Sequence, residues 1–245
     1  MPQISRKRSD MSSTFTLTGH TSSLSVEFET PIFLDPLKKY AIGLLSFDSY
    51  HTIPNIDAGN NKFRVLEDGK PSLVLEIPNG GYDIKSLTSE IQRLIRPHSF
   101  QITVHENTSK IDVLSSVKIG LGYPDDFGRL LGIRKPTEIL PDVRYTPIDR
   151  VNIRPHSNLE ITCNLVKNSY RNADEVHSIH SFAPLVPYGY KIVEKPMIPV
   201  YYPIGCRHIQ FITCSVVDHD DKLVSFQGEK ITIQLHLKEF NHHGN

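Results

Sequence analysis

The sequence predicts a mostly antiparallel β-protein, built as a sandwich or a barrel. The clearest sign is the run at residues 230–238, in which apolar residues alternate strictly with polar ones. Side chains of an extended chain point to alternate faces. We therefore expect one buried face and one outward face, the buried one formed by Ile231, Ile233, Leu235 and Leu237 and the other by Thr232, Gln234 and His236. The same alternation recurs at residues 24–28, 159–165 and 209–211, with Pro and Gly turns between the runs.

The first third of the chain contains further strand signals. Residues 14–18 and 24–29 are predicted as short strands, and the continuous apolar run at 40–47 as a strand that is buried on both faces. A loop rich in turn-forming residues follows at 53–61. Residues 63–66 and 73–77 then form a predicted hairpin around the turn at 68–71.

The periodicity becomes helical after Gly80-Gly81. Apolar residues from Ile84 to Ile95 follow the spacing of a helix, which Asp83 caps and Pro97 ends. Strands are predicted at 100–105 and 110–114, and a short second helix at 125–131. We interpret residues 80–135 as a helix–hairpin–helix insertion in an otherwise β chain.

The strand signal returns after Pro136. Eight strands are predicted within about 90 residues, which is the density of a β-sandwich. They lie at 150–153, 159–166, 177–182, 190–193, 200–202, 209–217, 223–226 and 231–237. The predicted organisation is thus a flexible basic arm at 1–13, one domain at 14–238 that contains the insertion, and a disordered tail at 239–245.

Composition excludes some classes of function. The 27 basic and 27 acidic residues give zero net charge, so the chain lacks the basic field of a general nucleic-acid binder. Only the arm with Arg6, Lys7 and Arg8 offers such a contact, and two readings stay open: a solvated tail, or an arm that touches nucleic acid or another subunit. No apolar run suits a membrane span or a signal peptide, so we expect neither.

The residues that could carry chemistry do not form a recognisable site. Cys163, Cys206 and Cys214 lack metal-ligand spacing, and we expect free thiols, with Cys163 and Cys214 buried on strands. His177 and His180 lie three apart in an extended context, which points them to opposite faces. The acidic run at 218–221 is interpreted as a hairpin turn rather than a calcium loop. With no nucleophile elbow and no phosphate loop, the sequence predicts neither an enzyme nor a cofactor.

Tyrosines gather between prolines at 184–203. Tyrosine offers a large rigid contact area and a hydrogen-bonding tip, which suits a subunit interface. The alternative, that these side chains cover the rim of the sandwich, stays open. The four tyrosines are Tyr188, Tyr190, Tyr201 and Tyr202.

Several stretches together resemble the minor capsid (penton) proteins of Polinton/Maverick elements, which are virus-like transposable elements related to adintoviruses. The stretches are YAIGLLSF at 40–47 with IPNI at 53–56, IPNGGY at 77–82, DFGRLLGI at 126–133, GYKIVE at 189–194, and 217–237 with its FQGEKITIQLHL run. They are spread over most of residues 14–238.

The resemblance implies a single jelly-roll β-sandwich that assembles as a homopentamer at the fivefold vertices of an icosahedral shell. The implied partner is a double jelly-roll major capsid protein, and the implied location is the virion, after synthesis in the host cytoplasm and with the nucleus as one place of assembly. Closing a ring needs two different patches on each subunit. Our candidates are the tyrosine region and the 53–61 loop with Pro54 and Asn55. A carbohydrate- or ligand-binding jelly roll is the alternative function.

Overall fold

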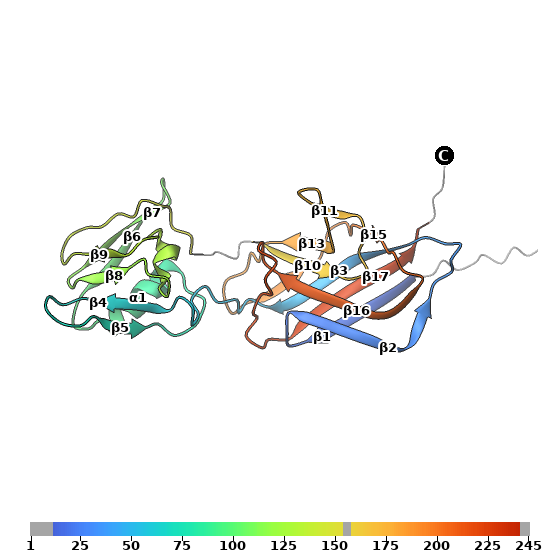
Figure 1. Ribbon diagram of the computed structural model, residues 1–245, viewed down its shortest axis with the longest axis horizontal. Helices are drawn as coiled ribbons and strands as arrows, with labels where there is room; N and C mark the ends of the chain where they lie inside the picture. The colour runs from blue at the N-terminus through green and yellow to red at the C-terminus, as the bar shows by residue number, and fades with distance from the viewer. Residues whose placement is uncertain (1–11, 154–157, 241–245) are drawn as a thin grey trace, which may run out of the picture. The chain divides into compact units, whose positions relative to one another are not determined.

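The computed structural model describes residues 12–153 and 158–240, and the chain divides into two compact units (Figure 1). The first, the jelly-roll unit, comprises residues 1–52 and 157–245. The second, the inserted unit, comprises residues 53–156. The predicted insertion at 80–135 is therefore too short at both ends. The predicted basic arm lies mostly outside the described residues, although its last two residues already belong to a strand.

The first sheet of the jelly-roll unit has the strand order β1-β17-β3-β14. Every pair in it is antiparallel. A short strand, β15, pairs with β3 beside β14. The bounds are β1 Ser12–Gly19, β3 Tyr40–Tyr50, β14 Lys191–Glu194, β15 Tyr202–Pro203 and β17 Ile231–Glu239. Glu239, which the sequence analysis assigned to the tail, belongs to β17, and residues 241–245 of the predicted tail lie outside the described residues.

The second sheet has the order β13-β10-β16-β2, also antiparallel. Its strands are β2 Ser23–Phe33, β10 Leu159–Cys163, β13 Ser178–Phe182 and β16 His208–Val217. We number the strands of this unit along the chain and leave out the short strands β11, β12 and β15. The first sheet then contains the first, eighth, third and sixth strands, and the second sheet contains the fifth, fourth, seventh and second. This wrapped order is that of a jelly roll, so the predicted fold class is confirmed. The inserted unit interrupts the jelly roll between its third and fourth strands.

The core of the jelly-roll unit lies between the two sheets. Ile231, Ile233, Leu235 and Leu237 are completely buried, whereas Thr232, Gln234 and His236 on the other face are half-buried, which confirms the alternation predicted for β17. Since β17 lies between β1 and β3, both of its edges are hydrogen-bonded.

Aromatic rings connect the two sheets across this core. Phe47 on β3 lies with its ring centroid 5.2 Å from that of Phe182 on β13 and 5.9 Å from that of Phe226. Cys163 and Cys214 are cross-strand neighbours and are buried as free thiols, as predicted. The side-chain hydrogen bond with Cys163, together with burial, raises the pKa of Cys214 well above its usual value. These thiols act as small apolar side chains.

The inserted unit has its own sheet, with the order β5-β4-β8-β9, and a separate hairpin, β6-β7. The predicted hairpin at 63–66 and 73–77 is confirmed as β4 Lys62–Val65 and β5 Leu73–Glu76. Because β4 also pairs with β8, the hairpin belongs to this unit, which explains the wider boundary. The other strands are β6 Phe100–His105, β7 Lys110–Ser115, β8 Ile119–Leu121 and β9 Thr137–Ile139. A shared apolar core that includes Phe63, Leu87 and Phe127 holds them together.

Two capped helices complete the inserted unit. α1 (Ile84–Leu94) starts at Asp83, whose carboxylate accepts from the Ser86 backbone N–H at 2.7 Å, as the sequence predicted. The second helix, η1 (Phe127–Leu131), is a 3₁₀ helix with Asp126 as its N-cap. The Asp126 carboxylate is buried and accepts three backbone N–H bonds, from Gly122, Tyr123 and Gly128. Burial raises its pKa against the opposing effect of these bonds.

Two predicted strands are absent from the described residues. At 150–153 the backbone bonds go to unrelated segments, from Val151 N to Ser109 O and from Asn152 N to Leu130 O, so no ladder forms. At 223–226 only Leu223 forms a bridge. Conversely, the hairpin β11 Ser169–Arg171 and β12 Asp174–Val176 was not predicted.

Candidate subunit interface

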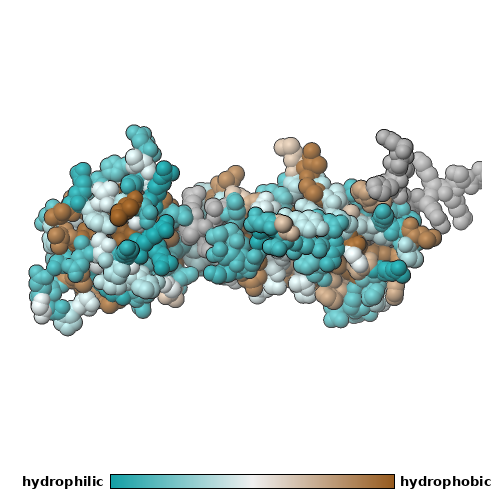
Figure 2. Space-filling model, turned by 45° about the horizontal axis from the view of Figure 1, so that its top comes forward, coloured by the Kyte–Doolittle hydropathy of each residue, from teal (hydrophilic) through white to brown (hydrophobic). Residues whose placement is uncertain are grey.

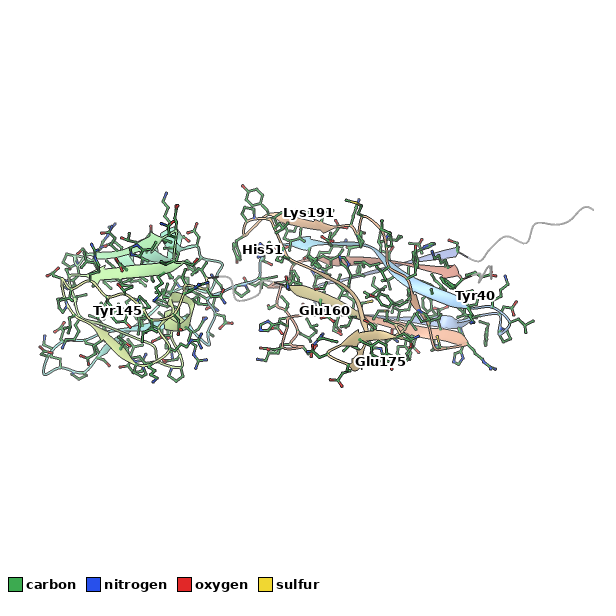
Figure 3. All side chains as sticks on the ribbon, turned by 90° about the horizontal axis from the view of Figure 1, so that it is seen from above. Tyr40, His51, Tyr145, Glu160, Glu175 and Lys191 are labelled. Carbon is green, nitrogen blue, oxygen red and sulfur yellow. The ribbon has the colours of Figure 1, made fainter. Side chains whose placement is uncertain are left out.

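The strand β14 forms one end of the first sheet. Its inner edge pairs with β3, and no other strand of the described residues pairs with its outer edge. Because β17 occupies the opposite edge of β3, both β14 and β15 follow the same side of β3. Lys191 on β14 and His51 just after β3 mark this region in Figure 3. An open strand edge exposes backbone groups that can pair with another chain.

Large apolar side chains flank this edge strand. Met197 is 97% exposed, Leu185 90% and Ile198 80%, and Tyr190, Val193 and Val200 are also exposed. We call these six residues the β14 edge surface. Figure 2 shows exposed apolar side chains, in brown, standing out from a mostly polar surface. Six exposed apolar residues within sixteen positions are typical of a surface that a protein partner covers.

The predicted tyrosines fall into two groups along this side of β3. Tyr188 and Tyr190 lie in the loop before β14 and are exposed. His51 anchors this loop, because its backbone N–H donates to the Tyr190 carbonyl at 2.8 Å and its Nδ1 donates to Val186 O at 2.7 Å. The ring centroids of His51 and Tyr188 are 6.3 Å apart. This pair of tyrosines is therefore held in position and accessible.

Tyr201 and Tyr202 are half-buried and have partners within the unit. The Tyr201 hydroxyl is 2.7 Å from His236 Nδ1, and the Lys238 ammonium lies 3.6 Å from the centroid of the Tyr201 ring. The segment can approach β3 closely only because position 43 is glycine, where an added Cβ would lie 2.8 Å from Val200 O. Tyr201 thus packs on the outer face of the first sheet, while Tyr202 belongs to β15.

Pro54 and Asn55 lie in the inserted unit. The Asn55 amide donates to the carbonyls of Tyr82 and Ile153, and its Oδ1 accepts from the Tyr82 backbone N–H at 2.8 Å. These bonds give Asn55 a role inside the unit, where it joins the start of the unit to segments 27 and 98 residues later.

We expect Asn55→Ala to lower the free energy of unfolding of the inserted unit by about 1–3 kcal/mol, because it leaves half-buried backbone groups without partners. Asn107→Ala, in the exposed turn between β6 and β7, is the matched control and should change stability by less than about 0.5 kcal/mol. Chemical denaturation of the full chain measures both. Equal midpoints for the two variants would contradict this structural role.

The histidines and the acidic run that the sequence singled out bond to neighbouring groups of the jelly-roll unit. The His177 ring bonds to Val166 O, and His180 pairs with Glu194 at 2.9 Å. The Asp218 carboxylate accepts from the backbone N–H groups of Asp220 and Lys222, so the acidic run is a turn, as predicted. Within residues 12–153 and 158–240, no three His, Cys, Asp or Glu side chains gather as metal ligands. In the same residues, no helix has the length and apolar character to cross a bilayer.

The sequence reasoning selected the tyrosines and missed the aliphatic residues beside them. Leu185, Met197, Ile198 and Val200 carry most of the exposed apolar character of the β14 edge surface. Leu185, Met197 and Ile198 gave a weak signal, because they stand between prolines and outside every predicted strand and helix. Val200 gave none, since residues 200–202 were predicted as a strand.

Comparison with known proteins gives an informative likeness in fold. No protein-family model matches the chain, and no curated protein matches its sequence. A crystal structure of selenomethionine-labelled mavirus penton protein is similar, with a TM-score of 0.50 over 94% of this chain and 100% of that chain, at 12% identity. The chain has the fold of this penton protein. The match covers 94% of this chain, which is more residues than either unit contains, so it includes parts of both the inserted unit and the jelly-roll unit.

Proposed function

We propose that this chain is a minor capsid protein, a penton that assembles as a homopentamer at the fivefold vertices of an icosahedral shell. The observation that carries the proposal is the shared fold with the mavirus penton protein over the full length of that protein. The resemblance of several sequence stretches to Polinton/Maverick pentons supports a virus-like transposable element as the source. The role needs no catalytic site.

The geometry of the jelly roll supports a cyclic assembly. A ring requires two different patches on each subunit, one for each neighbour. The β14 edge surface supplies one. At the other ends of the two sheets, β1 and β2 each have an edge that pairs with no other strand of the described residues, and Phe33 at the end of β2 is exposed. Open edges on opposite sides of one sandwich suit a closed ring, whereas a single contact surface would suit a twofold dimer.

The proposed partner outside the ring is a double jelly-roll major capsid protein, and the proposed location is the virion, after synthesis in the host cytoplasm and with the nucleus as one place of assembly. Co-expression with that partner and electron microscopy of the particles test the role. We expect density of this chain at the fivefold vertices, absent from particles made without it. Particles with closed vertices that never contain the chain would contradict the proposal.

One cavity in the jelly-roll unit favours the alternative of a ligand-binding module. A space of about 310 Å³ is lined by Tyr170, Arg171, His180, Tyr202 and Glu160, among others. Arg171 donates to Glu160 at 2.7 Å, and the other Glu160 oxygen is buried without a partner in the described residues. Aromatic and hydrogen-bonding side chains together are typical of saccharide sites. A glycan array decides this candidate: binding of a neutral glycan that Arg171→Ala abolishes would favour it over a purely structural role.

A further inference from the structure

The inserted unit contains an arginine-lined cavity that neither the fold nor the proposed assembly explains. It has a volume of about 400 Å³ and is lined by Arg129, Arg134, Arg150, Asn152, Asp149 and Gly132. Three arginines and one aspartate line it, which gives the lining an excess of two positive charges. The whole chain has zero net charge, so this excess of positive charge is local to the cavity.

Two of the arginines have no counter-ion within the described residues. The Asp149 carboxylate is already paired with Arg134 Nε at 2.7 Å. For Arg129 and Arg150, no carboxylate of residues 12–153 or 158–240 lies within ion-pair distance. Both side chains are exposed. Like charges gathered on one rim repel one another, and an anion between them would relieve the repulsion.

The backbone holds this arrangement rigidly. Gly132 has a φ of +81°, and an added Cβ would lie 2.5 Å from Asp149 O, so the two loops that carry the arginines are in close contact. Asn152 N donates to Leu130 O at 2.8 Å, which fixes the second loop to η1. At the start of η1, Asp126 holds the preceding turn. The loops that carry the arginines are thus fixed by backbone contacts, so binding an oxyanion orders the arginine side chains but little of the backbone.

We propose that this cavity binds a sulfate or phosphate ester carried on a saccharide, with Arg129 and Arg150 as the principal ligands and Asn152 donating to a neighbouring hydroxyl. Guanidinium groups recognise tetrahedral oxyanions through paired hydrogen bonds. The cavity is lined by no aromatic residue, so a neutral sugar would lack a stacking surface. A nucleic acid would require an extended basic surface, and the balanced charge of the chain supplies none.

Titration of the full chain with a sulfated heparin-derived hexasaccharide tests the proposal, by isothermal calorimetry at low salt. We expect measurable binding, weakened roughly tenfold by Arg129→Ala or Arg150→Ala, since each removes a hydrogen-bonded charge. Arg93→Ala is the matched control, because Arg93 lies in the same unit and pairs with Glu90 outside the cavity. It should leave the affinity unchanged. Circular dichroism of each variant confirms folding.

Further probes separate the possible ligands. The desulfated hexasaccharide should bind at least tenfold more weakly. The proposal would be overturned if the desulfated form, or inorganic sulfate or phosphate alone, bound with the same affinity as the sulfated hexasaccharide. Tighter binding of a single-stranded oligonucleotide would also overturn it, as would unchanged affinity in both arginine variants. The inference depends only on the inserted unit, so it stands or falls independently of whether the jelly-roll unit forms a pentamer.

Discussion

Ile233→Ala is expected to lower the free energy of unfolding of the jelly-roll unit by about 2–5 kcal/mol. Ile233 is completely buried between the sheets, and β17 is hydrogen-bonded on both edges, so the structure cannot close around the missing atoms. Truncation therefore removes transfer free energy and leaves a cavity. The midpoint of denaturant unfolding, together with its slope, measures the change.

Gln234→Ala is the neighbouring control. Gln234 is half-buried on the other face of the strand and accepts a hydrogen bond from the Ser46 hydroxyl at 3.2 Å. A bond of this kind contributes about 0.5–1.5 kcal/mol, so the cost should stay well below that of the isoleucine change. An equal loss of stability in the two variants would mean that both faces of β17 are packed in a core. This would contradict the half-buried state of Gln234 in the structure.

The combined substitutions Met197→Asp and Ile198→Asp are expected to abolish assembly and to leave the subunit folded. Both side chains are at least 80% exposed in the single chain, so their loss removes almost no buried area from it. In a ring they would be covered, and two carboxylates buried at a subunit contact would cost several kcal/mol. Analytical ultracentrifugation should show only the monomer, with an unchanged thermal midpoint.

Ile148→Asp is the matched control for this prediction. Ile148 is 86% exposed, similar to the 80% of Ile198. It belongs to the inserted unit and is not one of the six residues of the β14 edge surface. It should assemble as the parent protein does. A ring that survives the double substitution would remove the β14 edge surface from the proposed interface.

Features governed by local physics could be predicted from the sequence. The alternation at 231–237, the Asp83 cap and the turn at 218–221 each depend on a few neighbouring residues, and the structure confirms them. The limits of the inserted unit could not be predicted, because they depend on β4 pairing with β8, more than fifty residues later. β8 and β9 have only three residues each, too few to show a period.

The candidate interface was predictable only in part. Proline and tyrosine content drew attention to 184–203, and Tyr188 and Tyr190 are exposed there. Sequence could not show that Tyr201 turns onto the outer face of β17, since its partner His236 lies 35 residues away. Nor could it show which aliphatic residues stay uncovered, because exposure depends on the packing of the whole sandwich.

The mass of the native protein in solution tests the central claim most directly. Light scattering coupled to size exclusion, at high protein concentration, should give five times the 27.8 kDa mass of the chain, about 139 kDa. The same measurement is made in the presence of a double jelly-roll major capsid protein. A species of 27.8 kDa under both conditions would contradict the assignment of this chain as a penton.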